Sequence, residues 1–99
     1  MPVRIVAEFP AAPAKLADLS AALKAALTEI RADDGCEQIL PWLNAGRAPI
    51  VLVEWWRSFA DYDRFLGWRV ETGMLDLWDA LLEGGRAGFV PRKLVPAGC

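Results

Sequence analysis

One stretch in the middle of the chain constrains the fold more than any other, because an apolar run leads directly into a helix start. Residues 50–53 are Ile-Val-Leu-Val, which is typical of a buried strand, and Trp55 and Trp56 follow. Since side chains alternate along a strand, the two tryptophans should face opposite sides of the sheet. Ser58 stands where a helix N-cap belongs, with Asp61 three residues later as its acidic partner. The stretch therefore predicts a central strand followed by a capped helix.

The rest of the chain shows alternating strand and helix patterns. Leucines recur at helical spacing through residues 13–32, with Gly35 as a stop signal. Pro41 and Pro91 cannot donate to a sheet ladder, so their strands should lie at sheet edges. The expected elements are a strand over 3–9, a helix over 13–32, a strand over 36–43, a hairpin turn over 44–49, the central strand, the helix after Ser58 with a break near Gly73 and an end at Gly84-Gly85, and a strand over 86–95.

The order of these elements is β-α-β-β-α-β, which matches the split βαβ, or ferredoxin-like, α+β motif with a four-stranded antiparallel sheet. Right-handed crossovers place the first and third strands in the centre and the second and fourth at the edges. Both helices should cover one face and leave the other bare and apolar. We therefore expect a homodimer that buries the open sheet face.

Composition excludes several classes of protein. The 99 residues predict a single domain over 1–99, and five tryptophans are many for one small core, which favours a pocket or an interface. The formal charge is −2 with signs interspersed, so neither nucleic acid nor an anionic membrane is an expected partner. The start of the chain lacks a signal-peptide pattern, and the two cysteines, Cys36 and Cys99, form no disulfide framework. A cytoplasmic location is expected.

Histidine is absent from the chain. The commonest general base and the commonest metal ligand are therefore both missing. This absence limits the possible chemistry more than any residue that is present.

The chain contains three short motifs, which are Pro13-Ala14-Lys15, Asp34-Gly35-Cys36 and the segment from Val51 to Asp61. In this order, the three motifs resemble the antibiotic-biosynthesis-monooxygenase family of small dimeric α+β-barrel proteins. The resemblance spans roughly residues 3–83 and implies a dimeric α+β barrel. It also implies chemistry like that of quinol and anthrone oxygenases or of the haem-degrading members.

The chain departs from the family at its functional positions. Counting seven residues from Ser58, where many members have a histidine, gives Phe65. The haem-degrading branch resembles the chain at its first strand, but its asparagine is replaced by Phe9, its tryptophan falls at Phe65, and its iron-ligating histidine falls near Leu75. Haem degradation is therefore not expected, and Cys36 would be a remote alternative ligand.

The family resemblance implies a pocket between the sheet and the helices. Inward aromatic side chains there would suit a flat hydrophobic ligand, although helical spacing alone also explains some of them as core residues. The candidate pocket residues are Trp55 or Trp56, Phe65, Trp68 and Trp78.

Two polar residues are the candidate catalytic groups. Tyr62 could assist proton transfer if a cation lay close, and Arg69 could orient a phenolate or carboxylate. For both Arg57 and Arg69, however, a surface position paired with Asp61 or Glu71 is favoured over a buried one. For Glu54, pairing across the dimer is favoured over a role as a base.

Two functions remain open. The resemblance implies a cofactor-independent monooxygenase, using no metal, flavin or haem, that acts on a small aromatic, quinol- or anthrone-like compound. In such members the deprotonated substrate reacts directly with dioxygen. The alternative is a non-catalytic dimeric ligand-binding or structural module that lost its proton-transfer histidine. Isomerase or decarboxylase chemistry of the wider group is a third possibility that no residue selects.

Overall fold

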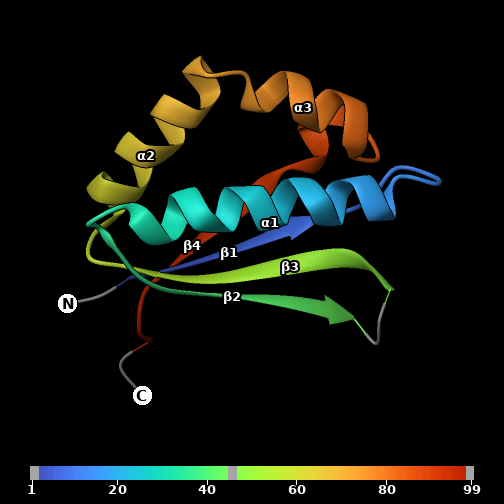
Figure 1. Cartoon of the computed structure of the whole chain (residues 1–99). Helices are drawn as coiled ribbons and strands as arrows, with labels where there is room; N and C mark the ends of the chain where they lie inside the picture. The colour runs from blue at the N-terminus through green and yellow to red at the C-terminus, as the bar shows by residue number, and fades with distance from the viewer. Residues whose placement is uncertain (1–2, 45–46, 98–99) are drawn as a thin grey trace.

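The computed structural model describes residues 3–44 and 47–97, and within these it forms an α+β ferredoxin-like fold (Figure 1). The four strands found there make one antiparallel sheet in the order β2-β3-β1-β4, as the sequence predicts. The elements run β1 (Val3–Phe9), α1 (Leu16–Ala32), β2 (Cys36–Asn44), β3 (Arg47–Trp56), α2 (Phe59–Glu71), α3 (Met74–Leu81), the 3₁₀ helix η1 (Gly85–Gly88) and β4 (Val90–Leu94).

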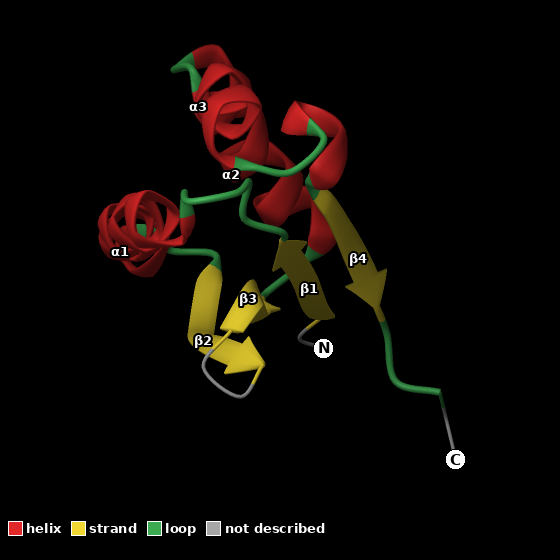
Figure 2. Cartoon of the chain, turned by 90° about the vertical axis from the view of Figure 1, so that its right-hand side faces the viewer, coloured by secondary structure: helices red, strands yellow, loops and turns green. Residues whose placement is uncertain are grey.

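Strand β3 separates the two faces of the sheet through the alternation of its side chains. Ile50, Leu52, Glu54 and Trp56 are buried on the face that the helices cover. The residues between them, including Val53 and Trp55, therefore point to the opposite face. Figure 2 shows the described helices gathered on one side of the sheet, with none of them covering the other side. Trp55 and Trp56 thus face opposite sides, which confirms the prediction.

The open face of the sheet carries apolar side chains from every strand. Val53 lies near its middle, between Leu40 of β2 and Val6 of β1 in the pairing register. At the edges, Trp42 and Val90 are more than half exposed. An apolar area of this kind is the surface on which the predicted dimer contact would form.

The hairpin between β2 and β3 differs from the prediction. Strand β3 begins at Arg47, so Pro49 lies inside the strand rather than at its boundary. A register shift in the pairing explains this, because Arg47 pairs with Asn44 and Ile50 with Leu43, and Pro49 has no partner. The predicted turn residues 45 and 46 lie outside the described part of the chain.

The start of α1 and the last strand differ from the sequence pattern, whereas the break at Gly73 agrees with it. Helix α1 begins at Leu16, three residues after the expected start, because Ala14 has a positive φ of 62°. Gly73 separates α2 from α3 in a left-handed conformation, which confirms the predicted break. The segment expected as one strand from residue 86 instead contains η1 before the shorter β4. Within residues 3–44 and 47–97, no helix is long and apolar enough to cross a membrane.

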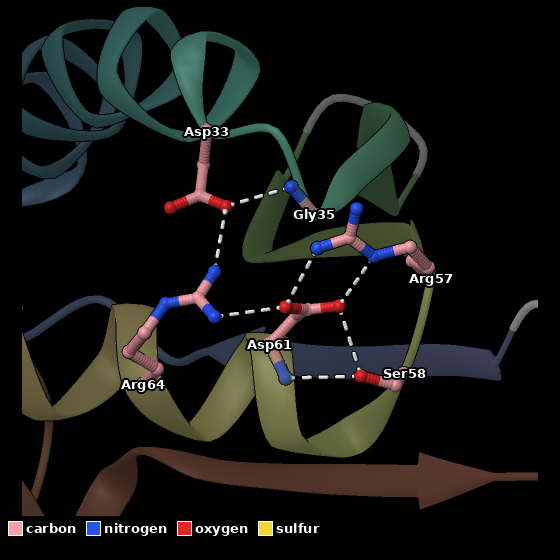
Figure 3. Close-up of polar contacts among 6 residues, drawn as sticks. All are labelled: Asp33, Gly35, Arg57, Ser58, Asp61 and Arg64. Atoms are coloured by element: carbon pink, nitrogen blue, oxygen red, sulfur yellow. Dashed lines mark hydrogen bonds and ion pairs between the residues drawn. The ribbon is translucent and has the colours of Figure 1, made fainter.

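The start of α2 is fixed by a buried carboxylate, that of Asp61 (Figure 3). Its oxygens accept hydrogen bonds from Arg57 at 2.8 and 3.0 Å, from the Ser58 hydroxyl at 2.9 Å and from Arg64 at 2.9 Å. In return, the Asp61 backbone N–H donates to Ser58 Oγ at 3.1 Å, which confirms the predicted N-cap. The hydrogen bonds, with those from Arg57 largest, hold the pKa of Asp61 well below its usual range.

Gly35 provides a test of this arrangement, because a side chain there would collide with Asp61. An added Cβ would lie 2.6 Å from the Asp61 Cβ atom, so Gly35→Ala should lower the free energy of unfolding by about 1–3 kcal/mol. Gly67→Ala is the matched control, since its Cβ would meet nothing within 4 Å and it lies inside helix α2. That variant should instead gain about 0.5–1 kcal/mol. Urea unfolding of both variants measures the difference, and equal effects would contradict the close approach.

Candidate functional site

A small cavity lies between the helix-covered face of the sheet and the helices above it. Its volume is about 40 Å³, which is enough for water but far below the roughly 300 Å³ of a typical ligand pocket. Most of its wall is apolar or aromatic, and three lining residues carry ionisable or phenolic groups. The lining residues are Phe9, Leu23, Ala26, Ile30, Leu52, Glu54, Tyr62, Phe65, Leu66, Arg69, Met74, Trp78 and Phe89.

Glu54 is the acidic group of this cavity. It is only 4% exposed, and its Oε1 accepts one hydrogen bond, from Trp56 Nε1 at 2.9 Å. Burial raises the pKa of Glu54 from 4.5 to about 7, and the hydrogen bond from Trp56 partly opposes that rise. A carboxyl group with a pKa near 7 can both accept and return a proton at neutral pH.

Tyr62 and Arg69 reach the same cavity from helix α2. Burial, followed by the nearby charge of Glu54, raises the pKa of Tyr62 far above its usual value, so its phenol stays protonated and keeps a hydrogen that it can donate. Arg69 Nη1 contacts Glu29 Oε2 of α1 at 2.6 Å. Because Arg69 lines the cavity while Glu29 is half exposed, this ion pair joins α1 to α2 between the cavity and solvent.

An aromatic cluster forms another part of the wall. The ring of Trp78 lies 5.1 Å from that of Phe9 and 6.1 Å from that of Phe89, measured between centroids. Trp78 is 3% exposed, and its Nε1 has no hydrogen-bond partner among the described residues. A buried donor without a partner is unusual in a folded protein.

The structure brings some of the predicted site residues together and separates others. Tyr62, Arg69, Phe65 and Trp78 all line the cavity. Trp56 is buried beside them, stacking edge-on against Tyr62 and donating to Glu54.

Trp55 and Trp68 lie elsewhere. Trp55 is on the opposite face of the sheet, where the guanidinium of Arg4 sits 5.3 Å from its ring. Trp68 is 48% exposed and contacts Phe65 from outside, because its position on α2 is off the inward stripe. Neither residue lines the cavity. Trp68 therefore differs from its expected placement, whereas for the alternative of Trp55 or Trp56 it is Trp56 that lies on the cavity side of the sheet.

The structure corrects the interpretation of Glu54. Pairing across the open sheet face is ruled out because its side chain is buried on the other, helix-covered face. Strand alternation would have indicated this position, since Glu54 is an even number of residues from Ile50, Leu52 and Trp56 and so shares their face. Arg57 is exposed and paired with Asp61, as expected, whereas Arg69 lines the cavity and pairs with Glu29 instead of Asp61 or Glu71.

Cys36 lies at the start of β2, does not line the cavity, and has a pKa raised to about 11, chiefly by burial, which disfavours the thiolate. Cys99 falls outside the described residues. Across residues 3–44 and 47–97, no group of three acidic, cysteine or histidine side chains is placed to hold a metal ion.

The fold and the cavity define a small ferredoxin-like α+β protein with a buried carboxyl group between its sheet and its helices. The family model for antibiotic biosynthesis monooxygenase matches residues 2–68. The chain therefore belongs to the antibiotic biosynthesis monooxygenase family. A comparison with curated proteins finds no match.

Solved structures share the fold over nearly the whole chain. The Rv0793 protein from Mycobacterium tuberculosis has 28% identity and a TM-score of 0.72, covering 97% of this chain and 95% of its own. The PA3566 protein from Pseudomonas aeruginosa has 24% identity and a TM-score of 0.78, covering 98% and 95%. The SO0527 protein from Shewanella oneidensis has 19% identity and a TM-score of 0.80, covering 94% and 88%. The last two, at lower identity, support the fold alone.

The buried carboxyl group predicts how stability depends on pH. The pKa of Glu54 is higher in the folded chain than its ordinary 4.5, so the unfolded chain loses this proton first as the pH rises. The stability that protonated Glu54 contributes to the folded state is therefore fully present below about pH 4.5 and is lost as the pH rises from there through 7. A shift of this size corresponds to roughly 3 kcal/mol at most. Asp61 acts in the opposite direction, because its lowered pKa removes stability only in acid.

We expect Glu54→Gln to flatten this loss of stability, since glutamine does not ionise. Urea unfolding at intervals between pH 5 and pH 8 measures the slope. Glu71→Gln, which changes an exposed glutamate at the end of α2, is the matched control and should keep the wild-type slope. The same slope in wild type and Glu54→Gln would contradict the raised pKa.

Proposed function

We propose that the chain is a cofactor-independent monooxygenase that acts on a small aromatic compound of quinol or anthrone type. The observation that carries this proposal is Glu54, a carboxyl group with a pKa near 7 in the wall of an aromatic cavity. It supplies the proton acceptor that the absence of histidine removes. Membership of the family supports oxygenase chemistry, and the choice of substrate class is our own inference.

In the proposed reaction, ionised Glu54 first removes a proton from the acidic carbon of an anthrone. The resulting carbanion adds dioxygen to give a peroxide anion, which takes the proton back from Glu54. Loss of water from this hydroperoxide leaves a carbonyl group, so one oxygen atom enters the product and the other leaves as water. Tyr62 donates a hydrogen bond and Arg69 supplies positive charge, and both stabilise the anionic stages.

The substrate must enlarge the cavity to enter. A volume of about 40 Å³ does not hold an aromatic ring system, and the Arg69–Glu29 ion pair lies between the cavity and solvent. Separation of this pair would let α2 and α3 move away from α1. It would also free Arg69 to contact an anionic substrate.

The small cavity also favours a second candidate, a non-catalytic ligand-binding or structural module. In that case the aromatic wall is core packing and Glu54 has no substrate. The two candidates differ in one measurable respect, which is whether bound quinols or anthrones consume oxygen.

Under either candidate we propose that the protein is a homodimer that buries its open sheet face. The support is the apolar surface around Val53, with Trp42 and Val90 exposed at its edges. The family resemblance implies the same association.

Oxygen uptake tests the enzymatic proposal. With a panel of quinols and anthrones, we expect Glu54→Gln to lower kcat by roughly 100-fold or more, because the proton acceptor is lost. The rate of the wild-type protein should rise with pH through about 7 as Glu54 ionises. Glu71→Gln should keep the wild-type rate. Unchanged turnover in Glu54→Gln would reject Glu54 as the base, and binding without any oxygen uptake would favour the second candidate.

Sedimentation velocity tests the dimer. Val53→Lys places a charge in the middle of the open face and should shift the protein to a monomer, because an unpaired charge is costly to bury. Val95→Lys, at an exposed position beyond β4, is the control and should leave the dimer intact. The wild-type Tm should also rise with protein concentration. A wild-type monomer at all concentrations would refute the proposal.

A further inference from the structure

The indole N–H of Trp78 is a polar group that the proposed reaction does not use. It belongs to a residue that is 3% exposed and lines the cavity, and it has no hydrogen-bond partner among the described residues. Leaving a buried donor unpaired costs free energy, so nearly all buried donors have a hydrogen-bond partner, and one that has none in the protein can be paired by water or by a ligand. Trp56, whose Nε1 donates to Glu54, shows that the other buried indole of this core is satisfied.

Trp78 and Glu54 lie toward different ends of the cavity. The ring of Trp78 packs on Phe9, which pairs with Ile50 in the sheet register, whereas Glu54 pairs with Ile5. Four residues separate these positions along each strand, which corresponds to roughly 13 Å between backbone positions.

We propose that Trp78 donates a hydrogen bond to an oxygen atom of the ligand. This oxygen lies on the opposite side of the ligand's ring system from the group that faces Glu54. This inference rests on the proposed function and narrows its substrate class. The ligand is an aromatic ring system with an acidic position at one end and a carbonyl or ether oxygen acceptor at the opposite end. The rings of Phe9, Phe65 and Phe89 contact its faces between the two polar ends.

Two matched probes test this proposal without turnover, under anaerobic conditions. 4-Methoxy-1-naphthol carries an oxygen acceptor opposite its hydroxyl, and 4-ethyl-1-naphthol has similar size without that acceptor. We expect the methoxy compound to bind about three- to tenfold more tightly, the range for one hydrogen bond. In ¹H–¹⁵N spectra, the indole N–H signal of Trp78, assigned through its contact with the Phe9 ring, should move downfield with the methoxy compound only.

Variants then show whether Trp78 is responsible. Trp78→Phe keeps an aromatic ring and removes the donor, so the two probes should bind it equally. Trp68→Phe removes an indole outside the cavity and should keep the preference. Should Trp78→Phe fail to fold, the signal in the wild-type protein decides alone.

Three results would overturn the proposal: equal binding of both probes to the wild type, a preference that survives in Trp78→Phe, or no binding of either probe. Failure of the enzymatic proposal gives a different result. In that case the wild-type protein consumes no oxygen with quinols or anthrones, while the preference for the methoxy probe and its loss in Trp78→Phe remain.

Discussion

The Asp61 carboxylate joins segments that are distant in the sequence, and the position of helix α2 depends on it. Arg57, directly after β3, and Arg64, within α2, both bind this carboxylate, and Arg64 also pairs with Asp33 at the end of α1. Gly35 allows the close approach because it has no side chain. The first turn of α2 is thereby held against the connection between α1 and β2. Since a helix is stiff over three turns, the inward residues that follow, which include those lining the cavity, take their positions from this end.

Two buried carboxyl groups in this small protein have opposite properties, and the number of donors around each explains the difference. The Asp61 carboxylate accepts hydrogen bonds from two arginines and a hydroxyl, so its charge is stabilised and its pKa falls. Glu54 has one neutral donor, Trp56, and burial raises its pKa to about 7. The first arrangement stabilises the fold over the neutral range. The second destabilises the fold at neutral pH and leaves a group that can exchange protons, as is common at functional sites.

The sequence predicts the fold well because its signals are local. Edge prolines, the Ser58 cap and the Gly73 break all act through backbone geometry within a few residues, and each lies where the pattern indicated. The cavity was less predictable because it depends on which side chains from several elements meet. Trp68 is an aromatic residue of the kind expected in a pocket, but it lies at the surface. Phe89 lines the cavity, and no residue near Phe89 in the sequence indicates this. The place of Glu54 in the cavity could have been predicted, because Glu54 is two residues from Trp56 on β3 and so faces the same side of the sheet.

The alternation of side chains along β3 places different chemical groups on the two faces of the sheet. Along β3, one set of alternate residues gives the helix-covered face its carboxyl group and its indole donor, and the other set gives the open face Val53 and Trp55. A shift of one residue in the register would exchange the two sets, bringing Glu54 to the surface and an aromatic ring into the cavity. The β2–β3 bulge contains Pro49, which has no partner in β2, so the pairing from Ile50 onward keeps this register. The proposed association through one face and the proposed proton exchange on the other would therefore both depend on the same strand.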